Sequence, residues 1–174
     1  MNTAALVGTF VGAFVGIVIV AIILKLTKTD KSNKCKYDER QQLVRGKGYQ
    51  YGFFSMMAVC VVSIMLHIGE VPLKIEESVI YFVIILVGVG VYASYCILQD
   101  SYFALNENKK TVLILFGAVG VMNLFIGIEK IMDGQMVENG VVGYDCINFL
   151  CGILFLVIFI MLLVKNAVDK REDD

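Results

Sequence analysis

Residues 4–24 read AALVGTFVGAFVGIVIVAIIL, a stretch that contains no Asp, Glu, Lys or Arg. A lipid bilayer has a hydrocarbon core about 30 Å thick, which about 20 helical residues cross at about 1.5 Å per residue. One charged residue at the centre of such a helix costs about 2.5 to 3.5 kcal/mol, whereas each strongly apolar residue returns only about 0.3 to 0.6 kcal/mol. Because this stretch has the required length and no charge, it predicts a membrane-spanning helix.

Four more apolar stretches without Asp, Glu, Lys or Arg follow along the chain. They cover residues 53–68, 79–98, 111–128 and 146–164. The composition agrees with this pattern, since 58% of the residues are hydrophobic and 18% are charged, against about half and about a quarter in soluble domains. The sequence therefore predicts one integral membrane domain over residues 1–174, an all-α bundle of five transmembrane helices, and it argues against a soluble globular protein.

Residues 4–24 are expected to stay in the mature chain, because the stretch lacks the basic start and the small-residue cleavage pattern of a secretory signal peptide. Of the 15 Lys and Arg residues, all but Lys74 and Lys130 then fall on one side of a five-span chain. Basic loops tend to stay on the cytoplasmic side of a membrane. We therefore predict a multi-pass plasma-membrane protein with its N-terminus outside and its C-terminus in the cytoplasm.

The segment 25–52, between the first two stretches, is the most distinctive part of the sequence. A run of lysines leads into YDERQQLVRGKGYQYGFF, residues 37–54, and the acidic residues near its start suit the positive end of a helix dipole. We predict a short cytoplasmic helix before the second span, with a bend or a close backbone contact at Gly46, Gly48 and Gly52.

This segment has two interpretations. Its lysines can serve only to fix the orientation of the chain at an anionic lipid surface. Alternatively, the segment docks a cytoplasmic or membrane protein partner, because its other polar side chains are more specific than attraction to lipid requires. The candidate docking residues are Asp38, Glu39, Arg40, Gln41, Gln42 and Arg45.

The string DERQ at residues 38–41, followed by RGKGYQYGFF at residues 45–54, resembles a motif of uncharacterised small multi-span membrane proteins of low-GC Gram-positive bacteria. The resemblance is confined to this segment, and only general hydropathy is shared elsewhere. It implies a bacterial plasma membrane, and it carries no activity, cofactor or residue role.

Small residues in the first stretch predict a packing face. Gly8, Gly12 and Gly16 form two overlapping G-x-x-x-G steps, which let two helix backbones approach closely. The partner is either another span of the same chain or a second protomer of a homo-oligomer. Residues 58–61 and 118–121 are similar enough to suggest a repeated helical hairpin, although chance similarity between apolar runs is the favoured explanation.

Polar residues within the spans or at their ends offer an alternative function. His67, Asn123, Glu129 and Asn148 could line a small oligomeric channel or transporter whose outer mouth carries acidic loops. His67 and Glu129, at similar predicted depth, could also bind a metal, but one His without a second strong ligand nearby is weak support. Hydrogen bonds between neighbouring helices are the ordinary role of the two asparagines.

The sequence has no catalytic or cofactor signature. It contains no Ser-His-Asp set, no H-E-x-x-H helix and no P-loop, and its five cysteines include no C-x-x-C pair. We therefore expect no enzymatic activity, no cofactor, no metal site and no nucleic-acid partner. The leading hypothesis is a non-enzymatic accessory or regulatory component that sits in the lipid bilayer and docks a partner through its basic segment.

Overall fold

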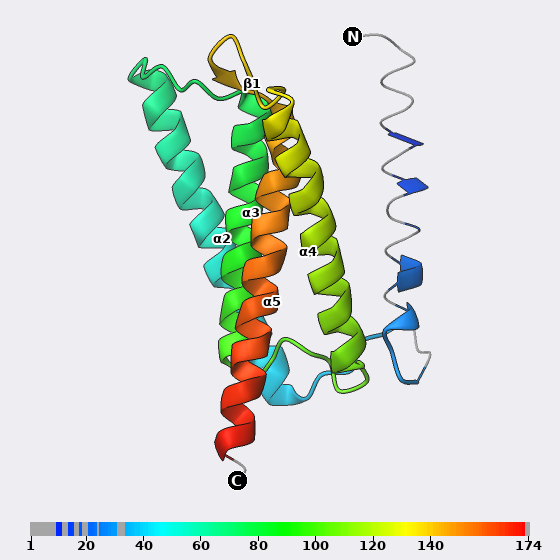
Figure 1. Ribbon diagram of the computed structural model, residues 1–174. Coiled ribbons are helices and arrows are strands. Elements are labelled where there is room, and N and C mark those ends of the chain that lie inside the picture. Colours follow the sequence, from blue (N-terminus) through cyan, green and yellow to red (C-terminus); the bar gives the residue numbers. More distant parts are fainter. Residues whose placement is uncertain are drawn as a thin grey trace.

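A computed structural model gives the architecture of the chain (Figure 1). It describes residues 34–172, residues 25–30 and, within the first apolar stretch, residues 10, 11, 14, 15, 18 and 21–23. The predicted first span and its glycines Gly8, Gly12 and Gly16 therefore lie largely outside the described residues. The elements in chain order are α2 (Glu39–Ile68), α3 (Glu77–Leu98), α4 (Lys109–Met132), β1 (Val137–Glu138), β2 (Val141–Val142), the 3-10 helix η1 (Tyr144–Cys146) and α5 (Ile147–Glu172).

The four long helices have the length and surface of membrane spans. The shortest, α3, has 22 residues, which is enough to cross a hydrocarbon core about 30 Å thick. Large apolar side chains point outward rather than into a core, as Phe54 (66% exposed) and Phe125 (71% exposed) illustrate. A soluble protein rarely leaves such surface in water. By length and composition, each of the four described helices could cross a membrane, so the chain is an all-α bundle of apolar, membrane-length helices.

The start of α2 differs from the prediction. One helix of 30 residues runs from Glu39 to Ile68, straight through Gly46, Gly48 and Gly52. The expected separate short helix is therefore wrong, and the stretch 53–68 is only the last part of α2. The alternative that we considered, a close backbone contact, is confirmed at Gly52, because a Cβ there would lie 2.8 Å from the carbonyl oxygen of Gly88.

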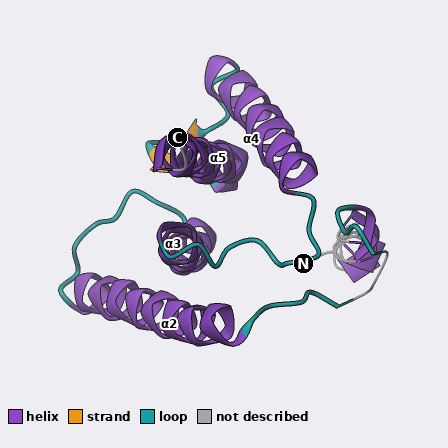
Figure 2. Ribbon diagram, turned by 90° about the horizontal axis from the view of Figure 1, so that it is seen from below, coloured by secondary structure: helices purple, strands orange, loops and turns teal. Residues whose placement is uncertain are grey.

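The helices form two antiparallel hairpins that meet through their inner members. α2 packs on α3 and α4 packs on α5, while α3 and α5 bring the hairpins together; Figure 2 shows α2 and α4 on the outside of this arrangement. The best-buried apolar cluster joins Ala93 and Ile97 of α3 to Ile158 and Leu162 of α5. It lies toward one end of the bundle, directly under the loop that follows α3.

Glycines let α4 and α5 approach closely. A Cβ on Gly127 would lie 2.6 Å from the backbone of Phe149, and a Cβ on Gly152 would lie 2.6 Å from the backbone of Leu124. Within a bilayer, such small residues allow backbone contact and van der Waals packing between helices. The second hairpin is therefore fixed by glycines on both of its helices.

Three helices end in the same way, with a Schellman motif that satisfies their last carbonyl groups. At the end of α3, Ser101 N donates to Cys96 O (2.8 Å) and Asp100 N donates to Ile97 O (3.2 Å). The motif needs a left-handed residue after the cap, which Asp100 supplies at φ 54°. Equivalent hydrogen bonds end α2 and α4, where Glu70 and Gly134 are the left-handed residues. Only α4 uses the glycine that this conformation prefers.

A two-stranded hairpin, which was not predicted from the sequence, joins α4 to α5. β1 and β2 pair in the register Val137 with Val142 and Glu138 with Val141. Asn139 and Gly140 form the turn with φ values of 52° and 78°, as a type I′ turn requires and as the Asn-Gly pair favours.

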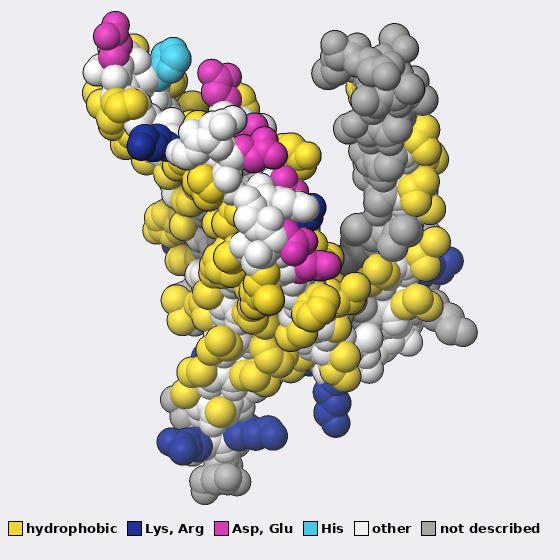
Figure 3. All heavy atoms as spheres, turned by 45° about the horizontal axis from the view of Figure 1, so that its top comes forward, with side chains coloured by type: hydrophobic (Ala, Val, Ile, Leu, Met, Phe, Trp, Pro, Cys, Tyr) yellow, Lys and Arg dark blue, Asp and Glu magenta, His cyan; other side chains and the backbone are white. Residues whose placement is uncertain are grey.

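Charge separates the two ends of the bundle. Asp and Glu side chains gather at the end where α2 and α4 finish, and Lys and Arg side chains gather at the opposite end (Figure 3). We call the first the acidic end. The second, which holds the starts of α2 and α4 and the ends of α3 and α5, is the basic end. The helix directions therefore bring together the basic segments that the sequence analysis had grouped on one side.

Candidate functional site

The most highly organised polar structure in the described chain lies at the basic end. It joins two segments that are far apart in the sequence, the one before and at the start of α2 and the loop between α3 and α4. We call it the basic-end platform and define it as residues 27–30, 34–45 and 99–108. It contains all six candidate docking residues.

Asp38 and Gln41 fix the start of α2. Asp38 Oδ1 accepts a hydrogen bond from Gln41 N (2.6 Å), and Gln41 Oε1 accepts one from Asp38 N (3.3 Å), which together form a capping box. This pairing satisfies two backbone donors at the helix end. Glu39, in the first turn, adds a negative charge at the positive end of the helix dipole.

The buried side chain of Gln41 also reaches across to the α3–α4 loop. Its Nε2 atom donates to Asp100 O (3.4 Å) and to Phe103 O (3.2 Å), and only 8% of the residue is exposed. The amide therefore caps its own helix with its oxygen and holds the loop with its nitrogen.

Two arginines of α2 bind the same loop. Arg45 Nη1 donates to Ser101 O (3.3 Å) and Tyr102 O (3.4 Å), and its guanidinium lies 4.1 Å from the centre of the Tyr37 ring. Arg40 Nη2 donates to Gln99 O (3.3 Å). The left-handed turn after α3 directs these carbonyl groups toward α2. The residues that end α3 therefore supply the acceptors for the arginine side chains of α2.

Gln42 is the remaining candidate docking residue. Its Nε2 atom donates to Tyr37 O (3.0 Å), just before the helix, and its side chain lies on the exposed surface with those of Glu39 and Arg40. The six candidates therefore differ in their contacts. Gln41 and Arg45 hold the loop, and Asp38 caps α2. Glu39 and Gln42 are exposed at the surface, and Arg40 is exposed but also donates to the loop at Gln99 O.

Asn106 is the centre of the second half of the platform. Its Nδ2 atom donates to Asp30 Oδ1 and to Lys34 O, both at 3.0 Å, and its Oδ1 atom accepts from Lys36 N at 3.0 Å. Its backbone oxygen accepts from Thr29 N (2.9 Å). Only 5% of the residue is exposed. Asn106 therefore holds the segment between the first apolar stretch and α2 in place.

Backbone bonds extend the connection on both sides of Asn106. Leu105 N donates to Lys36 O (2.8 Å) and Asn108 N donates to Thr27 O (2.9 Å). Asn108 is also the N-cap of α4, where its Oδ1 atom accepts from Lys110 N (3.1 Å). The exit of the first apolar stretch is therefore fixed beside the start of α4.

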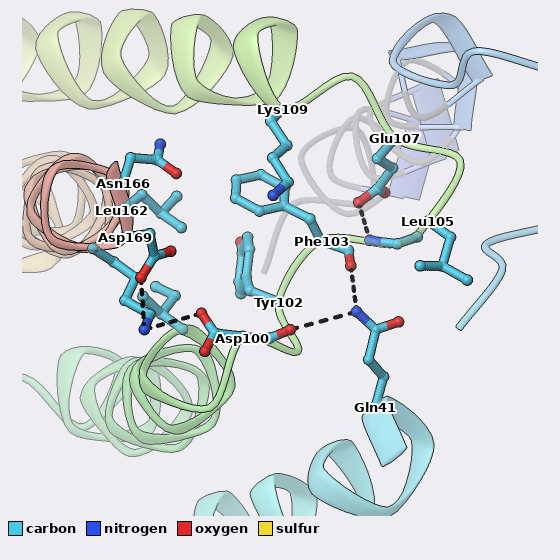
Figure 4. A pocket seen from close by; sticks show the side chains of 13 residues that line it. Gln41, Asp100, Tyr102, Phe103, Leu105, Glu107, Lys109, Leu162, Asn166 and Asp169 are labelled. Carbon is cyan, nitrogen blue, oxygen red and sulfur yellow. Dashed lines mark hydrogen bonds and ion pairs between the residues drawn. The ribbon is translucent and has the colours of Figure 1, made fainter. Parts of the chain in front are cut away.

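A cavity of about 230 Å³ opens between this loop, the start of α4 and the end of α5, and Figure 4 shows the side chains that line it. On one wall, Lys165 Nζ lies 3.1 Å from Asp100 Oδ1 and 3.0 Å from Asp169 Oδ1. On another, Lys109 Nζ lies 5.8 Å from the centre of the Phe103 ring. The ion pair ties the end of α5 to the platform.

Two tyrosines of the platform lie in poorly hydrated surroundings. Burial raises the pKa of Tyr102, whose ring packs against the cluster under the loop. Burial also raises the pKa of Tyr37, although the neighbouring Arg45 charge opposes the shift. Both phenols therefore stay neutral at ordinary pH, as their packing requires.

The residues proposed for a pore or metal site lie on three helices, His67 on α2, Asn123 and Glu129 on α4, and Asn148 on α5. Asn123 Nδ2 donates to Val119 O of its own helix (2.8 Å), Asn148 is half-buried near the start of α5, and Glu129 is exposed in the last turn of α4. His67 lines a cavity with Glu77 of α3, not with Glu129. Among the described residues, no group of three or more His, Cys, Asp or Glu could hold a metal ion.

The loop 99–108 was not among the predicted features. Its sequence, QDSYFALNEN, contains Asn and Asp residues that favour turns and helix caps. That composition could have marked a structured loop. The role of Asn106 could not have been read, because its side-chain partner Asp30 lies 76 positions away.

Comparison of the chain with models of protein families, with curated proteins and with solved structures finds no match.

Proposed function

We propose that the chain is a non-enzymatic accessory or regulatory component of a bacterial plasma membrane, and that it docks a protein partner through its basic-end platform. The observation that carries this proposal is the platform itself. Buried polar side chains lock two distant segments together and hold a set of charged side chains at the surface.

The proposed topology has five spans, with residues 4–24 as the first. The charge separation between the two ends supports a cytoplasmic basic end, because loops rich in Lys and Arg stay on the cytoplasmic side. The bond between Thr27 O and Asn108 N supports a first span that leaves the bilayer beside α4. The N-terminus would then be outside and the C-terminus inside.

The platform is more elaborate than an orientation signal needs to be. Lysines near an anionic lipid surface gain about 1 kcal/mol each without any fixed structure. Here Asn106 and Gln41 are almost fully buried, and burying an amide is favourable only when its hydrogen bonds are made. Such internal order suits a preformed surface, since preorganisation lowers the entropy that binding would otherwise lose.

The structure refines the roles within this proposal. Arg45 and Gln41 would position the surface, because their side chains are committed to loop carbonyl groups. Glu39, Arg40 and Gln42, which are exposed, would contact the partner. A change at Gln41 or Arg45 should alter the platform, whereas a change at Glu39 should alter binding alone.

Photocrosslinking tests the proposal. A photoreactive amino acid is placed at Glu39 or at Gln42 in the full chain within the membrane, with Glu138 at the acidic end as the matched control. We expect one defined protein adduct from the first two positions and not from the third. Adducts with lipid alone from all three positions would contradict a docking role.

An oligomeric channel or transporter is the competing proposal. The acidic end supports it, because acidic loops can concentrate cations at a pore mouth. Ion flux across liposomes that contain only the purified chain would favour it over the docking role.

A further inference from the structure

A second cavity lies at the acidic half of the first hairpin. α2 and α3 touch closely near their middles, at Gly52 and Gly88, and diverge toward the acidic end (Figure 1). Between the diverging halves is a cavity of about 230 Å³. Its lining includes Ser63, His67, Glu77, Ile80, Tyr81 and Ile84.

The lining combines an apolar wall with one carboxylate. Ile80 and Ile84 follow one another along α3, one helical turn apart, and extend the apolar wall into the bundle. Ser63 Oγ donates to Val59 O of its own helix (2.9 Å), so its proton is not offered to a ligand. Glu77, one turn before Tyr81 on the same helix, supplies a negative charge at the exposed end of the cavity.

The positive end of the α3 dipole, in whose first turn Glu77 lies, offsets only part of that charge. Among the described residues, no Lys or Arg lines this cavity, and Glu77 forms no ion pair with any of them. Acidic side chains also predominate at this end of the bundle (Figure 3), and their combined field favours cations. A carboxylate at a mostly apolar cavity is well suited to an ammonium group whose substituent is apolar.

We infer that the cavity between α2 and α3 binds an amphipathic amine, with its ammonium group on Glu77 and its apolar part against Ile80 and Ile84. The exposed ring of Tyr81 adds a cation–π contact to the same charge. This inference does not depend on the docking role, because the cavity lies at the opposite end of the bundle from the platform. A soluble amine and the headgroup of an aminophospholipid share this chemistry.

Binding of 2-phenylethylamine to the purified full chain in a non-ionic detergent tests the inference. We expect saturable binding by calorimetry, and none of the uncharged analogue 2-phenylethanol. Glu77→Gln keeps the shape of the side chain and removes its charge, and should weaken binding at least about tenfold. The matched control is Glu70→Gln, at the same end but outside the lining, which should bind as the unmodified chain does.

A second variant tests the shape of the cavity rather than its charge. Ser63→Leu fills part of the volume, removes a hydroxyl bonded only within its own helix, and should also abolish binding. The helical circular dichroism signal and the elution volume show whether Ser63→Leu folds. If it does not, the comparison of Glu77→Gln with the unmodified chain still tests the inference. Equal binding to Glu77→Gln and to the unmodified chain would overturn the inference.

Nanodiscs distinguish the two sources of the amine. If phosphatidylethanolamine displaces 2-phenylethylamine and phosphatidylglycerol does not, the site takes the lipid headgroup. If neither lipid competes and the soluble amine still binds, the site takes a free amine. Absence of saturable binding by both the soluble amine and phosphatidylethanolamine would rule out the site.

Discussion

Gly52 of α2 faces Gly88 of α3 across so short a gap that a Cβ at position 52 would lie 2.8 Å from the Gly88 carbonyl oxygen. One turn earlier, Gly48 meets side chains of α3, with Cys96 Sγ 3.1 Å from its hypothetical Cβ. The start of α2 is thereby held against the end of α3. This spacing allows Gln41 and Arg45 to reach the carbonyl groups of the loop after α3.

Gly52→Ala should therefore destabilise the chain, because its Cβ meets backbone, which can move only if the helices separate. We expect a loss of about 1 to 3 kcal/mol, the usual range for overpacking, measured as a lower midpoint of thermal unfolding in detergent. Gly46→Ala is the control, since nothing lies within 4 Å of its Cβ and alanine favours a helix by up to about 1 kcal/mol. Equal stability of the two variants would show that the close contact is not formed.

Asn106→Asp should release the segment before α2. The change replaces an amide donor with a carboxylate oxygen that faces Asp30 Oδ1 and Lys34 O, and an unsatisfied buried group costs about 1 to 3 kcal/mol. Trypsin should then cut more rapidly at the lysines in residues 25–36. Asn139→Asp is the matched control at an exposed position of the acidic end and should leave the cleavage rate unchanged. Equal protection of both variants would argue against the hydrogen bonds of Asn106.

The sequence predicted the helices better than it predicted their contacts. Apolar stretches of membrane length located the four described helices, because crossing a bilayer fixes both the length and the polarity of a helix. The same pattern could not decide whether Gly46, Gly48 and Gly52 bend a helix or pack against a neighbour, since a glycine allows either. For Gly52, the position of Gly88 in the fold shows the close contact.

The contacts of the candidate docking residues could be predicted only in part. Residue types at the start of α2 indicated a helix start and a specific polar surface, and the capping box at Asp38 agrees with the first of these. Hydropathy carries no information on which polar groups meet across the fold, and Gln41 and Phe103 are 62 positions apart. For that reason, the sequence could not show that Gln41 and Arg45 hold the loop after α3.

Arg45→Lys should loosen the loop after α3 while keeping the charge. Lysine cannot hold two neighbouring carbonyl groups in the fixed geometry of a guanidinium or stack flat on Tyr37. We expect faster amide hydrogen exchange in residues 99–104. Arg40→Lys, which loses a single exposed bond to Gln99 O, should have little effect there. Equal exchange in both variants would contradict the clamp.

Alkaline pH should open the platform through Tyr102. Because burial raises the pKa of this phenol in the folded chain, the folded state favours the neutral form. Its contribution to stability is complete below the unfolded value of about 10 and is lost as the pH rises above 10 toward the raised value. The unfolding midpoint should therefore fall more steeply above pH 10 in the unmodified chain than in Tyr102→Phe. Parallel curves would show that Tyr102 is not buried.

Cysteine labelling tests the proposed orientation. Cys35 lies exposed at the basic end, so a variant that retains it as the single cysteine should react with a membrane-impermeant maleimide only after cells are permeabilised. Glu138→Cys, introduced into a cysteine-free chain, is the matched position in the exposed hairpin at the acidic end and should react in intact cells. We expect opposite results from the two positions, because the hairpin and the platform lie at opposite ends of helices that would each cross the membrane once. Reaction of Cys35 alone in intact cells would show that the orientation is the reverse of the proposed one. Reaction of both positions in intact cells would exclude a bundle that crosses the membrane between them.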